Sequence, residues 1–321
     1  MSRRTIVINL MVALALLLGA ATLAYAQTVV ATIPAGDGPT GVAVNAKANR
    51  IYVTNFNDAT VSVIDGASNT IVATIPVGNR PDGVAVNAKT SRIYVANGFD
   101  FTVSVIDGAS NTVVATILAG DGPRGVAVNT KINRIYVTNS NDFTVSVING
   151  ASNTVVATIP VGAGPVGVAL SAKTNRIYVA NFLDDTVSVI DGANNTIVAT
   201  IPVGDNPHGV AVNTKDNRIY VANFFDFTVS VIDGASNTIV ATIPVGVGPA
   251  GVGVNAKAKA NRIYVPNVSD NTVSVIDGAS NTVVATIPVG VGPLGVAVNE
   301  RTNRTYVANS TDDTISVIAE D

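Results

Sequence analysis

The sequence predicts an all-β protein: a seven-bladed β-propeller whose blades are four-stranded antiparallel sheets. A unit of about 42 residues recurs seven times, and each unit contains four strand-like runs. A further run near the N-terminus completes the last unit. The composition agrees with this class, because 47% of the residues are hydrophobic, mostly Val, Ile and Ala, only 13% are charged, and 28 glycines and 14 prolines mark frequent turns.

Residues 1–26 have the pattern of a signal peptide. Two arginines precede an apolar segment, and an A-x-A cleavage site ends at Ala26. We therefore expect export to the periplasm, the extracellular space or the cell surface, with 27–321 as a single propeller domain without a membrane span. An uncleaved anchor is the alternative, since 6–24 is long enough to cross a bilayer. The Ser-Arg-Arg start also resembles a twin-arginine export signal.

The repeat is marked by the string R-x-Y-V-x-N. Its tyrosines are 42 residues apart, except for one interval of 44 that contains two extra residues in 255–261. The seven tyrosines are Tyr52, Tyr94, Tyr136, Tyr178, Tyr220, Tyr264 and Tyr306. Sequence periods of this size are typical of propellers and other repeat arrays.

Each repeat contains four runs that we label a, b, c and d, and in the first repeat these are 41–45, 50–55, 60–64 and 70–75. Run c alternates Thr or Ser with Val, as a pleated strand does. Run a is built of small residues, which suits a crowded position. Pro76 closes run d, where its missing N–H is tolerated at a sheet edge. Short connections make each repeat an antiparallel meander.

The two ends of the sequence predict a closed ring. The last c run, 314–318, is near the C-terminus, so the seventh repeat has no d run of its own. The first d run, 28–33, precedes every a run. We expect this N-terminal strand to complete the seventh blade, because closure removes two exposed sheet edges.

Two copies of the repeat spell a known signature: Tyr-Val-Thr-Asn at 52–55 and at 136–139. The other five read YVAN or YVPN. Over its whole mature length the chain resembles the YVTN-repeat β-propeller family. The resemblance implies an exported, periplasmic or cell-surface propeller of the kind that includes archaeal surface-layer components, and it implies little about chemistry. The chain does not resemble quinoprotein or WD-repeat propellers, whose repeats rely on Trp, which is absent here.

The meander places the b–c and d–a loops on one rim, here called the top rim, and the a–b and c–d loops on the other, the bottom rim. The bottom rim has 15 basic and seven acidic residues, whereas the top rim has 13 acidic residues and only Arg80 and Arg124 as bases. We expect each bottom-rim Arg that opens run b to pair with the c–d Asp of its repeat, except in the third and seventh repeats. Polyanion or membrane-surface binding is the alternative. A nucleic-acid partner is not expected, because no aromatic residues interleave with these bases.

All eight phenylalanines lie in the b–c loops of the first five repeats. Exposed apolar clusters often mark interaction sites. The candidates for contact with a partner are Phe56, Phe99, Phe182, Phe224 and Phe225. The other three, Phe101, Phe143 and Phe227, share the parity of the run c valines. They either extend the core between blades or form a half-exposed rim, and the polar residues at the equivalent positions favour the rim.

The d–a loops are expected to line the mouth of the central channel. The residue between their Pro and Gly differs in every repeat: Thr40, Asp82, Arg124, Val166, His208, Ala250 and Leu294. We expect Asp82 and Arg124, in adjacent blades, to form an ion pair, which leaves His208 without a chemical partner. These three complete the set of candidate partner-binding residues.

An aspartate recurs in every b–c loop, and seven carboxylates on one rim are compatible with calcium. Hydrogen bonds from these side chains to nearby backbone are the favoured interpretation, because the loops lack the ligand spacing of an EF-hand. The seven are Asp58, Asp100, Asp142, Asp184, Asp226, Asp270 and Asp312.

The sequence therefore favours an exported, monomeric, non-catalytic binding or scaffold module of the cell envelope, with no cofactor, no metal and no catalytic residues. Its partner would be a protein or another envelope component held at the top rim. A metal-dependent hydrolase or lyase at the top funnel is the alternative, although one His and two Glu supply few ligands. The absence of Cys excludes thiolate catalysis. A lattice-forming surface protein is a third possibility, since the two faces have opposite charge.

Overall fold

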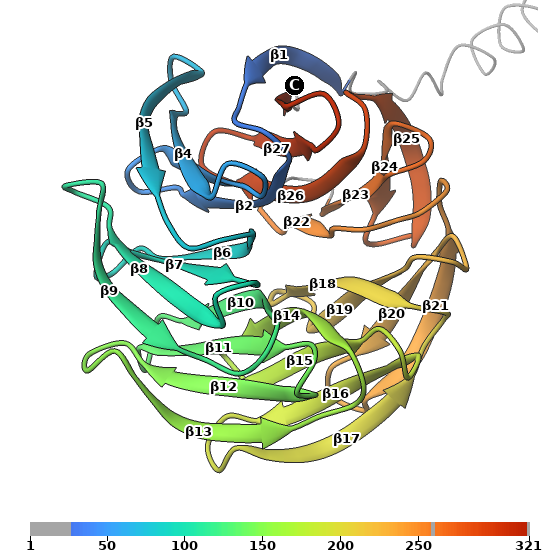
Figure 1. Ribbon diagram of the computed structural model, residues 1–321. Helices are drawn as coiled ribbons and strands as arrows, with labels where there is room; N and C mark the ends of the chain where they lie inside the picture. The colour runs from blue at the N-terminus through green and yellow to red at the C-terminus, as the bar shows by residue number, and fades with distance from the viewer. Residues whose placement is uncertain (1–26, 258–260, 320–321) are drawn as a thin grey trace, which may run out of the picture.

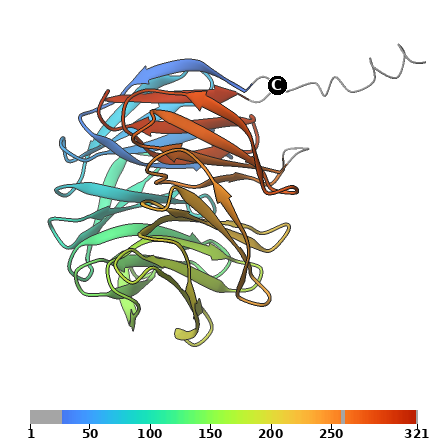
Figure 2. The same ribbon diagram turned by 90° about the vertical axis from the view of Figure 1, so that its right-hand side faces the viewer.

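The computed structural model describes residues 27–257 and 261–319, which form seven four-stranded antiparallel sheets around a central axis (Figure 1). The predicted seven-bladed propeller is confirmed. Figure 2 shows the ring from the side, with the strands running between the two rims. Within the described ranges, no helix is long and apolar enough to cross a membrane. The predicted signal peptide, 1–26, lies outside the described residues.

The strands follow the predicted order in every blade, with run a innermost and run d outermost (Figure 1). The inner strands are β2 (Pro39–Asn45), β6 (Pro81–Asn87), β10 (Pro123–Asn129), β14 (Pro165–Ser171), β18 (Pro207–Asn213), β22 (Gly253–Asn255) and β26 (Pro293–Asn299). The second strands are β3 (Arg50–Asn55), β7 (Arg92–Asn97), β11 (Arg134–Asn139), β15 (Arg176–Asn181), β19 (Arg218–Asn223), β23 (Arg262–Asn267) and β27 (Arg304–Asn309). The third strands are β4 (Thr60–Asp65), β8 (Thr102–Asp107), β12 (Thr144–Asn149), β16 (Thr186–Asp191), β20 (Thr228–Asp233), β24 (Thr272–Asp277) and β28 (Thr314–Ala319). The outer strands are β1 (Thr28–Pro34), β5 (Thr70–Pro76), β9 (Thr112–Leu118), β13 (Thr154–Pro160), β17 (Thr196–Pro202), β21 (Thr238–Pro244) and β25 (Thr282–Pro288).

The ring closes as predicted, because β1 pairs antiparallel with β28 and becomes the outer strand of the seventh blade. Thr28 lies opposite Ala319 and Pro34 lies opposite Thr314. Ile33 of β1 packs in one core cluster with buried residues of blades seven and one. The closure therefore joins the two ends of the described chain by both hydrogen bonds and apolar packing.

The hydrophobic core is divided into seven clusters, one at each interface between neighbouring blades. The repeat tyrosine is fully buried in each cluster. Tyr52, for example, packs beside Val61 and Val63 of its own blade and against Ile93 and Val95 of the next. Burial raises the pKa of the phenols of Tyr52, Tyr94, Tyr136, Tyr178, Tyr220 and Tyr306, to about 12 for Tyr220. The tyrosine of the signature therefore stabilises the contact between blades.

The asparagine of the signature fastens the b–c hairpin. In the third blade, Asn139 Nδ2 donates hydrogen bonds of 2.9 Å to both Thr144 Oγ1 and Ser146 Oγ. All seven blades repeat this pair of hydrogen bonds. Each asparagine is completely buried, so its amide needs these partners. The Tyr and Asn of the signature therefore have structural roles: Tyr packs between blades, and Asn holds the b–c hairpin.

Seven glycines, six in the inner strands and one just before β22, bring neighbouring blades into contact at the axis. A Cβ atom at any of them would lie within 3.0 Å of a main-chain carbonyl oxygen of the next blade. The pairs run around the ring: Gly41 with Asp82, Gly83 with Arg124, Gly125 with Val166, Gly167 with His208, Gly209 with Ala250, Gly251 with Leu294, and Gly295 with Thr40. The glycine of each run a is thus required by the close approach of one backbone to another.

The outer strands carry a bulge that protects the blade edge. Opposite the step from Val63 to Ile64, strand β5 has an extra residue, Val72, which has no partner in the register. The same shift occurs in every other blade. Bulges bend an edge strand away from flat pairing with another chain.

The sixth blade departs from the pattern. Its inner strand, β22, is only three residues long and is preceded by an isolated bridge between Pro249 and Asn267. Pro266 replaces the Thr or Ala of the signature, and its carbonyl oxygen accepts the N–H of Ala250. In the first and third blades the N–H of the equivalent glycine donates to the signature Thr hydroxyl. Pro266 has no such group, and the Gly251 N–H donates to the Leu294 carbonyl oxygen of the next blade at 3.1 Å.

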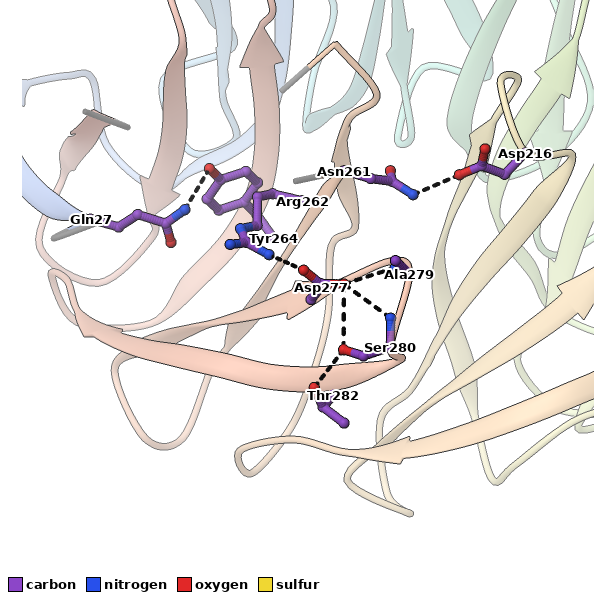
Figure 3. Close-up of polar contacts among 9 residues, drawn as sticks. All are labelled: Gln27, Asp216, Asn261, Arg262, Tyr264, Asp277, Ala279, Ser280 and Thr282. Carbon is purple, nitrogen blue, oxygen red and sulfur yellow. Dashed lines mark hydrogen bonds and ion pairs between the residues drawn. The ribbon is translucent and has the colours of Figure 1, made fainter. Parts of the chain in front are cut away.

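The predicted Arg–Asp pairs on the bottom rim are confirmed in five blades: Arg50–Asp65, Arg92–Asp107, Arg176–Asp191, Arg218–Asp233 and Arg262–Asp277. Figure 3 shows the last of these, in which Arg262 Nη1 lies 2.5 Å from Asp277 Oδ2. Asp277 also accepts the backbone N–H groups of Ala279 and Ser280 at the c–d turn. Bottom-rim charge is thus partly used to hold the turns.

Candidate functional site

The recurrent b–c aspartates join the two kinds of top-rim loop. Asp142 Oδ2 accepts the backbone N–H of Asp121 at 2.7 Å, and Asp184 Oδ2 accepts that of Ala163 at 2.6 Å. The other five make the same bond to the d–a loop of their blade. The predicted backbone hydrogen bonds are confirmed, but they reach the d–a loop rather than the turn that contains each aspartate.

No group of three or more His, Cys, Asp or Glu residues able to hold a metal ion occurs in the described part of the chain.

The phenylalanines of the top rim divide into an exposed and a half-buried set. The exposed side chains, with their exposed fractions, are Phe99 (62%), Phe225 (58%), Phe101 (45%), Phe143 (43%) and Phe227 (40%). Phe56, Phe182 and Phe224 are half-buried. These three candidates for contact with a partner are thus partly covered, because the Phe56 ring lies against Arg80 and the rings of Phe182 and Phe224 lie against His208.

Three of the exposed rings belong to residues with a left-handed backbone. Phe101, Phe143 and Phe227 have φ angles of 59°, 55° and 57°. This conformation costs an ordinary residue about 1–2 kcal/mol, and Asn and Asp tolerate it best. The same position holds Asp or Asn in the fourth, sixth and seventh blades. Of the two alternatives for these phenylalanines, the half-exposed rim is confirmed and the core is excluded.

Arg80 lies between two aromatic rings. Its guanidinium carbon is 4.4 Å from the ring centre of Phe99 and 5.5 Å from that of Phe56. Cation–π contacts of this kind contribute about 0.5–1 kcal/mol at exposed sites. This contact shows that the top rim holds a cation against its phenylalanines.

His208 has two aromatic neighbours that the sequence did not indicate. Its ring centre is 6.2 Å from that of Phe182, in an edge-on arrangement, and 6.3 Å from that of Phe224. Burial lowers the pKa of His208 below its usual value of 6.5, and the Arg124 guanidinium lowers it further. The Asp82 carboxylate and a hydrogen bond with the Ala250 main chain oppose this shift. The imidazole is therefore uncharged at neutral pH.

A cavity of about 490 Å³ opens at the top end of the channel. As predicted, the variable residues of the d–a loops line it, namely Thr40, Asp82, Arg124, His208 and Leu294. Val166 and Ala250, the other two, are buried. Phe56, Asn57 and Ser310 add side chains from the b–c loops, and four glycines complete the lining: Gly38, Gly41, Gly251 and Gly295.

The predicted ion pair between Asp82 and Arg124 is wrong. Both side chains line the cavity, yet neither forms an ion pair or hydrogen bond with any residue that the structure describes. The neighbouring blades hold the two backbones in place, but this leaves the direction of each side chain free. The cavity therefore presents one unpaired anion and one unpaired cation.

Sequence reasoning missed several exposed apolar residues of the top rim, among which Leu183 lies in a b–c loop. Leu183, next to Phe182, has 61% of its side chain exposed. Its position is equivalent to those of Phe99 and Phe225 in the second and fifth blades. Alignment of the b–c loops by their shared Asp was the signal that could have identified it.

No protein-family model matches the chain, and no curated protein matches it. The YVTN-repeat resemblance thus stays a prediction. A solved structure described as Kuenenia stuttgartiensis Hydrazine Synthase is similar to the chain, with a TM-score of 0.80 and 20% identity. The match covers 88% of this chain and 95% of the other. The likeness shows a common fold, and it supports the seven-bladed propeller found here.

Proposed function

We propose that this protein is an exported, non-catalytic propeller of the YVTN-repeat type that binds a component of the cell envelope at its top rim. The observation that carries the proposal is the group of five exposed phenylalanines, Phe99, Phe101, Phe143, Phe225 and Phe227. Exposed apolar clusters with polar surroundings mark interaction surfaces.

The fold does not need phenylalanine at these five positions for its stability. The fold accepts polar residues at the same loop positions, as Asn57, Asn141, Ser269 and Asn271 demonstrate. Three of the five rings also sit on a left-handed backbone that favours Asn over Phe. Five phenylalanines at positions where the fold accepts Asn or Ser support a role in binding.

The charge of the top rim indicates the chemistry of the partner. Thirteen acidic residues surround the phenylalanines, against two arginines. Arg80 already rests on the rings of Phe56 and Phe99. We propose that the partner presents basic and apolar groups together, since aromatic rings beside carboxylates attract such groups.

The geometry around His208 supports a non-catalytic role. The imidazole packs between two phenylalanine rings and bonds the Ala250 main chain. Among the residues described, the imidazole forms no hydrogen bond with a carboxylate or a hydroxyl group, the arrangement by which a His activates a nucleophile.

The test compares three proteins as baits for a detergent-solubilised envelope fraction of the producing cells. They are the wild type, a rim variant with all five exposed phenylalanines changed to Asn, and a control variant. The control changes five outer-strand valines of similar exposure to Thr: Val72, Val114, Val156, Val198 and Val240. We expect one envelope component to be retained by the wild type and the control, and to be lost with the rim variant.

The proposal would be overturned if the three baits retained the same components. The export part is tested separately, by the N-terminal sequence of the protein recovered from the envelope or medium. We expect that sequence to begin at Gln27, one residue before β1 starts at Thr28. A chain that retains residues 1–26 in the cytosol would contradict export.

A further inference from the structure

The channel-mouth cavity has features of a small-molecule site that the proposed envelope partner does not explain. Its volume of about 490 Å³ is in the range of ligand pockets, roughly 300–1,000 Å³. It lies on the axis, where residues from six of the seven blades converge. The exposed phenylalanines, by contrast, lie on the b–c loops and are not part of its lining.

The side chains that line the cavity differ from blade to blade, although the backbone that carries them is repeated. At the position between Pro and Gly, the seven repeats have seven different residues, while Pro and Gly themselves recur in all seven. The backbone at this position is fixed, because its carbonyl oxygen lies against the glycine of the preceding blade. Only the side chain is free to differ. A ring of different side chains on equivalent backbones suits the recognition of a ligand that has no rotational symmetry.

The charges in the cavity define what such a ligand must carry. Asp82 and Arg124 face the same space without an ion pair or hydrogen bond to any other described side chain. His208 is neutral, so the two charges of the lining cancel. A carboxylate on the ligand would satisfy Arg124, and an ammonium group would satisfy Asp82. A ligand with one charge would satisfy one residue and meet a like charge on the other.

The remaining wall combines two apolar side chains and glycines with the uncharged polar side chains of Thr40, Asn57, His208 and Ser310. Leu294 and Phe56 contribute hydrocarbon, and Gly41, Gly251 and Gly295 expose main-chain atoms to the cavity. This lining favours a compact aliphatic body between the two charged groups of the ligand.

We propose that the channel-mouth cavity binds a small zwitterion, of the α-amino-acid class, with its carboxylate on Arg124, its ammonium group near Asp82 and an aliphatic side chain against Leu294 and Phe56. Binding there requires neither the envelope partner nor the exposed phenylalanines.

The test uses isothermal titration of the mature protein with three probes that share one aliphatic body. L-leucine carries both charges, 4-methylpentanoate lacks the ammonium group, and 3-methylbutylamine lacks the carboxylate. We expect L-leucine to bind with a Kd below about 1 mM. Each singly charged probe is expected to bind at least tenfold more weakly, because it leaves one charge of the cavity unsatisfied.

Two variants separate the charged contacts. Asp82→Asn is expected to weaken L-leucine binding about tenfold or more and to leave 4-methylpentanoate no weaker. Arg124→Met is expected to weaken L-leucine likewise and to leave 3-methylbutylamine no weaker. Asp121→Asn, a top-rim charge outside the cavity lining, is the matched control and is expected to retain wild-type binding.

The inference is overturned if neither L-leucine nor glycine, L-phenylalanine or L-glutamate binds, or if a singly charged probe binds as tightly as L-leucine. It is also overturned if Asp82→Asn and Arg124→Met bind L-leucine as the wild type does. The rim variant with five Asn residues is expected to retain L-leucine binding while losing the envelope component. Failure of either proposal is therefore distinguishable from failure of the other.

Discussion

Replacement of Gly125 by Ala tests how the blades meet at the axis. A Cβ atom there would lie within 3.0 Å of the Val166 carbonyl oxygen, 3.1 Å from Val168 Cγ1 and 3.2 Å from Thr138 Oγ1. The first of these is backbone of the next blade, which cannot rotate away. The two blades must separate locally, and overpacking of this kind costs about 1–3 kcal/mol. For a domain of this size that corresponds to a fall in Tm of roughly 2–5 °C.

Gly98→Ala is the matched control, because it adds the same methyl group at a position where there is room for it. A Cβ atom at Gly98 would be 3.4 Å from the Pro123 carbonyl oxygen and 3.5 Å from that of Arg80, which are ordinary contacts. The change also restricts the unfolded chain, so it is expected to leave stability unchanged or raise it by about 0.4–1 kcal/mol. Thermal and urea unfolding measure both variants. Equal stability of the two alanine variants would refute the account of close approach at the inner strands.

Three further predictions concern the rims and the channel mouth. Asp142→Ala removes the acceptor for the backbone N–H of Asp121, and we expect a loss of about 0.5–1.5 kcal/mol in urea unfolding; no loss would show that these aspartates do not hold the d–a loops. Burial lowers the pKa of His208, so as the pH falls below 6.5 the unfolded chain takes up a proton at this residue before the folded protein does, and the free energy of unfolding decreases. His208→Gln should flatten this part of the pH profile of stability. An unchanged profile would contradict the prediction. Backbone N–H groups of Ser68 and Ala67 lower the pKa of Asp65 to about 2. The contribution of Asp65 to stability is therefore present above pH 3.8 and is lost as the pH falls towards 2. Asp65→Asn should reduce the loss of stability between these pH values, and an acid transition identical to that of the wild type would refute the prediction.

The architecture could be predicted from the sequence because one tyrosine recurs at the same position in every repeat. The period of the tyrosines gives the number of blades, and the displaced run 28–33 gives the ring closure. The structure adds the reason for the signature: Tyr52 and its equivalents fill the interfaces between blades, and Asn139 and its equivalents fasten the hairpins. A repeat signature of this kind reports packing, so it carries little information on chemistry.

The polar equivalents correctly favoured the half-exposed rim for three phenylalanines, whereas the parity of strand c pointed to the core, for a local reason. The parity argument extended the alternation of strand c through the turn to Phe101, Phe143 and Phe227. The left-handed backbone at these residues breaks that alternation and turns the rings outward. Conversely, Phe182 and Phe224 lie close to the loop tips in sequence but pack on His208, which belongs to a different loop.

The ion pair expected between Asp82 and Arg124 illustrates another limit. Adjacent blades place two equivalent backbones side by side, but the direction of each side chain depends on rotamers that a repeat does not specify. The contact between Arg80 and the rings of Phe56 and Phe99 was missed for the same reason.

The most direct measurement of the central claim is photo-crosslinking at the exposed phenylalanines in the producing cells. A benzophenone amino acid would replace Phe99 or Phe225 on the top rim and, as the control, Val72 on an outer strand. We expect both top-rim positions to form a crosslink to the same envelope component, and the Val72 position to form none with it. Crosslinking of that component from Val72 but not from Phe99 or Phe225, or none from either top-rim position, would contradict a binding surface on this rim.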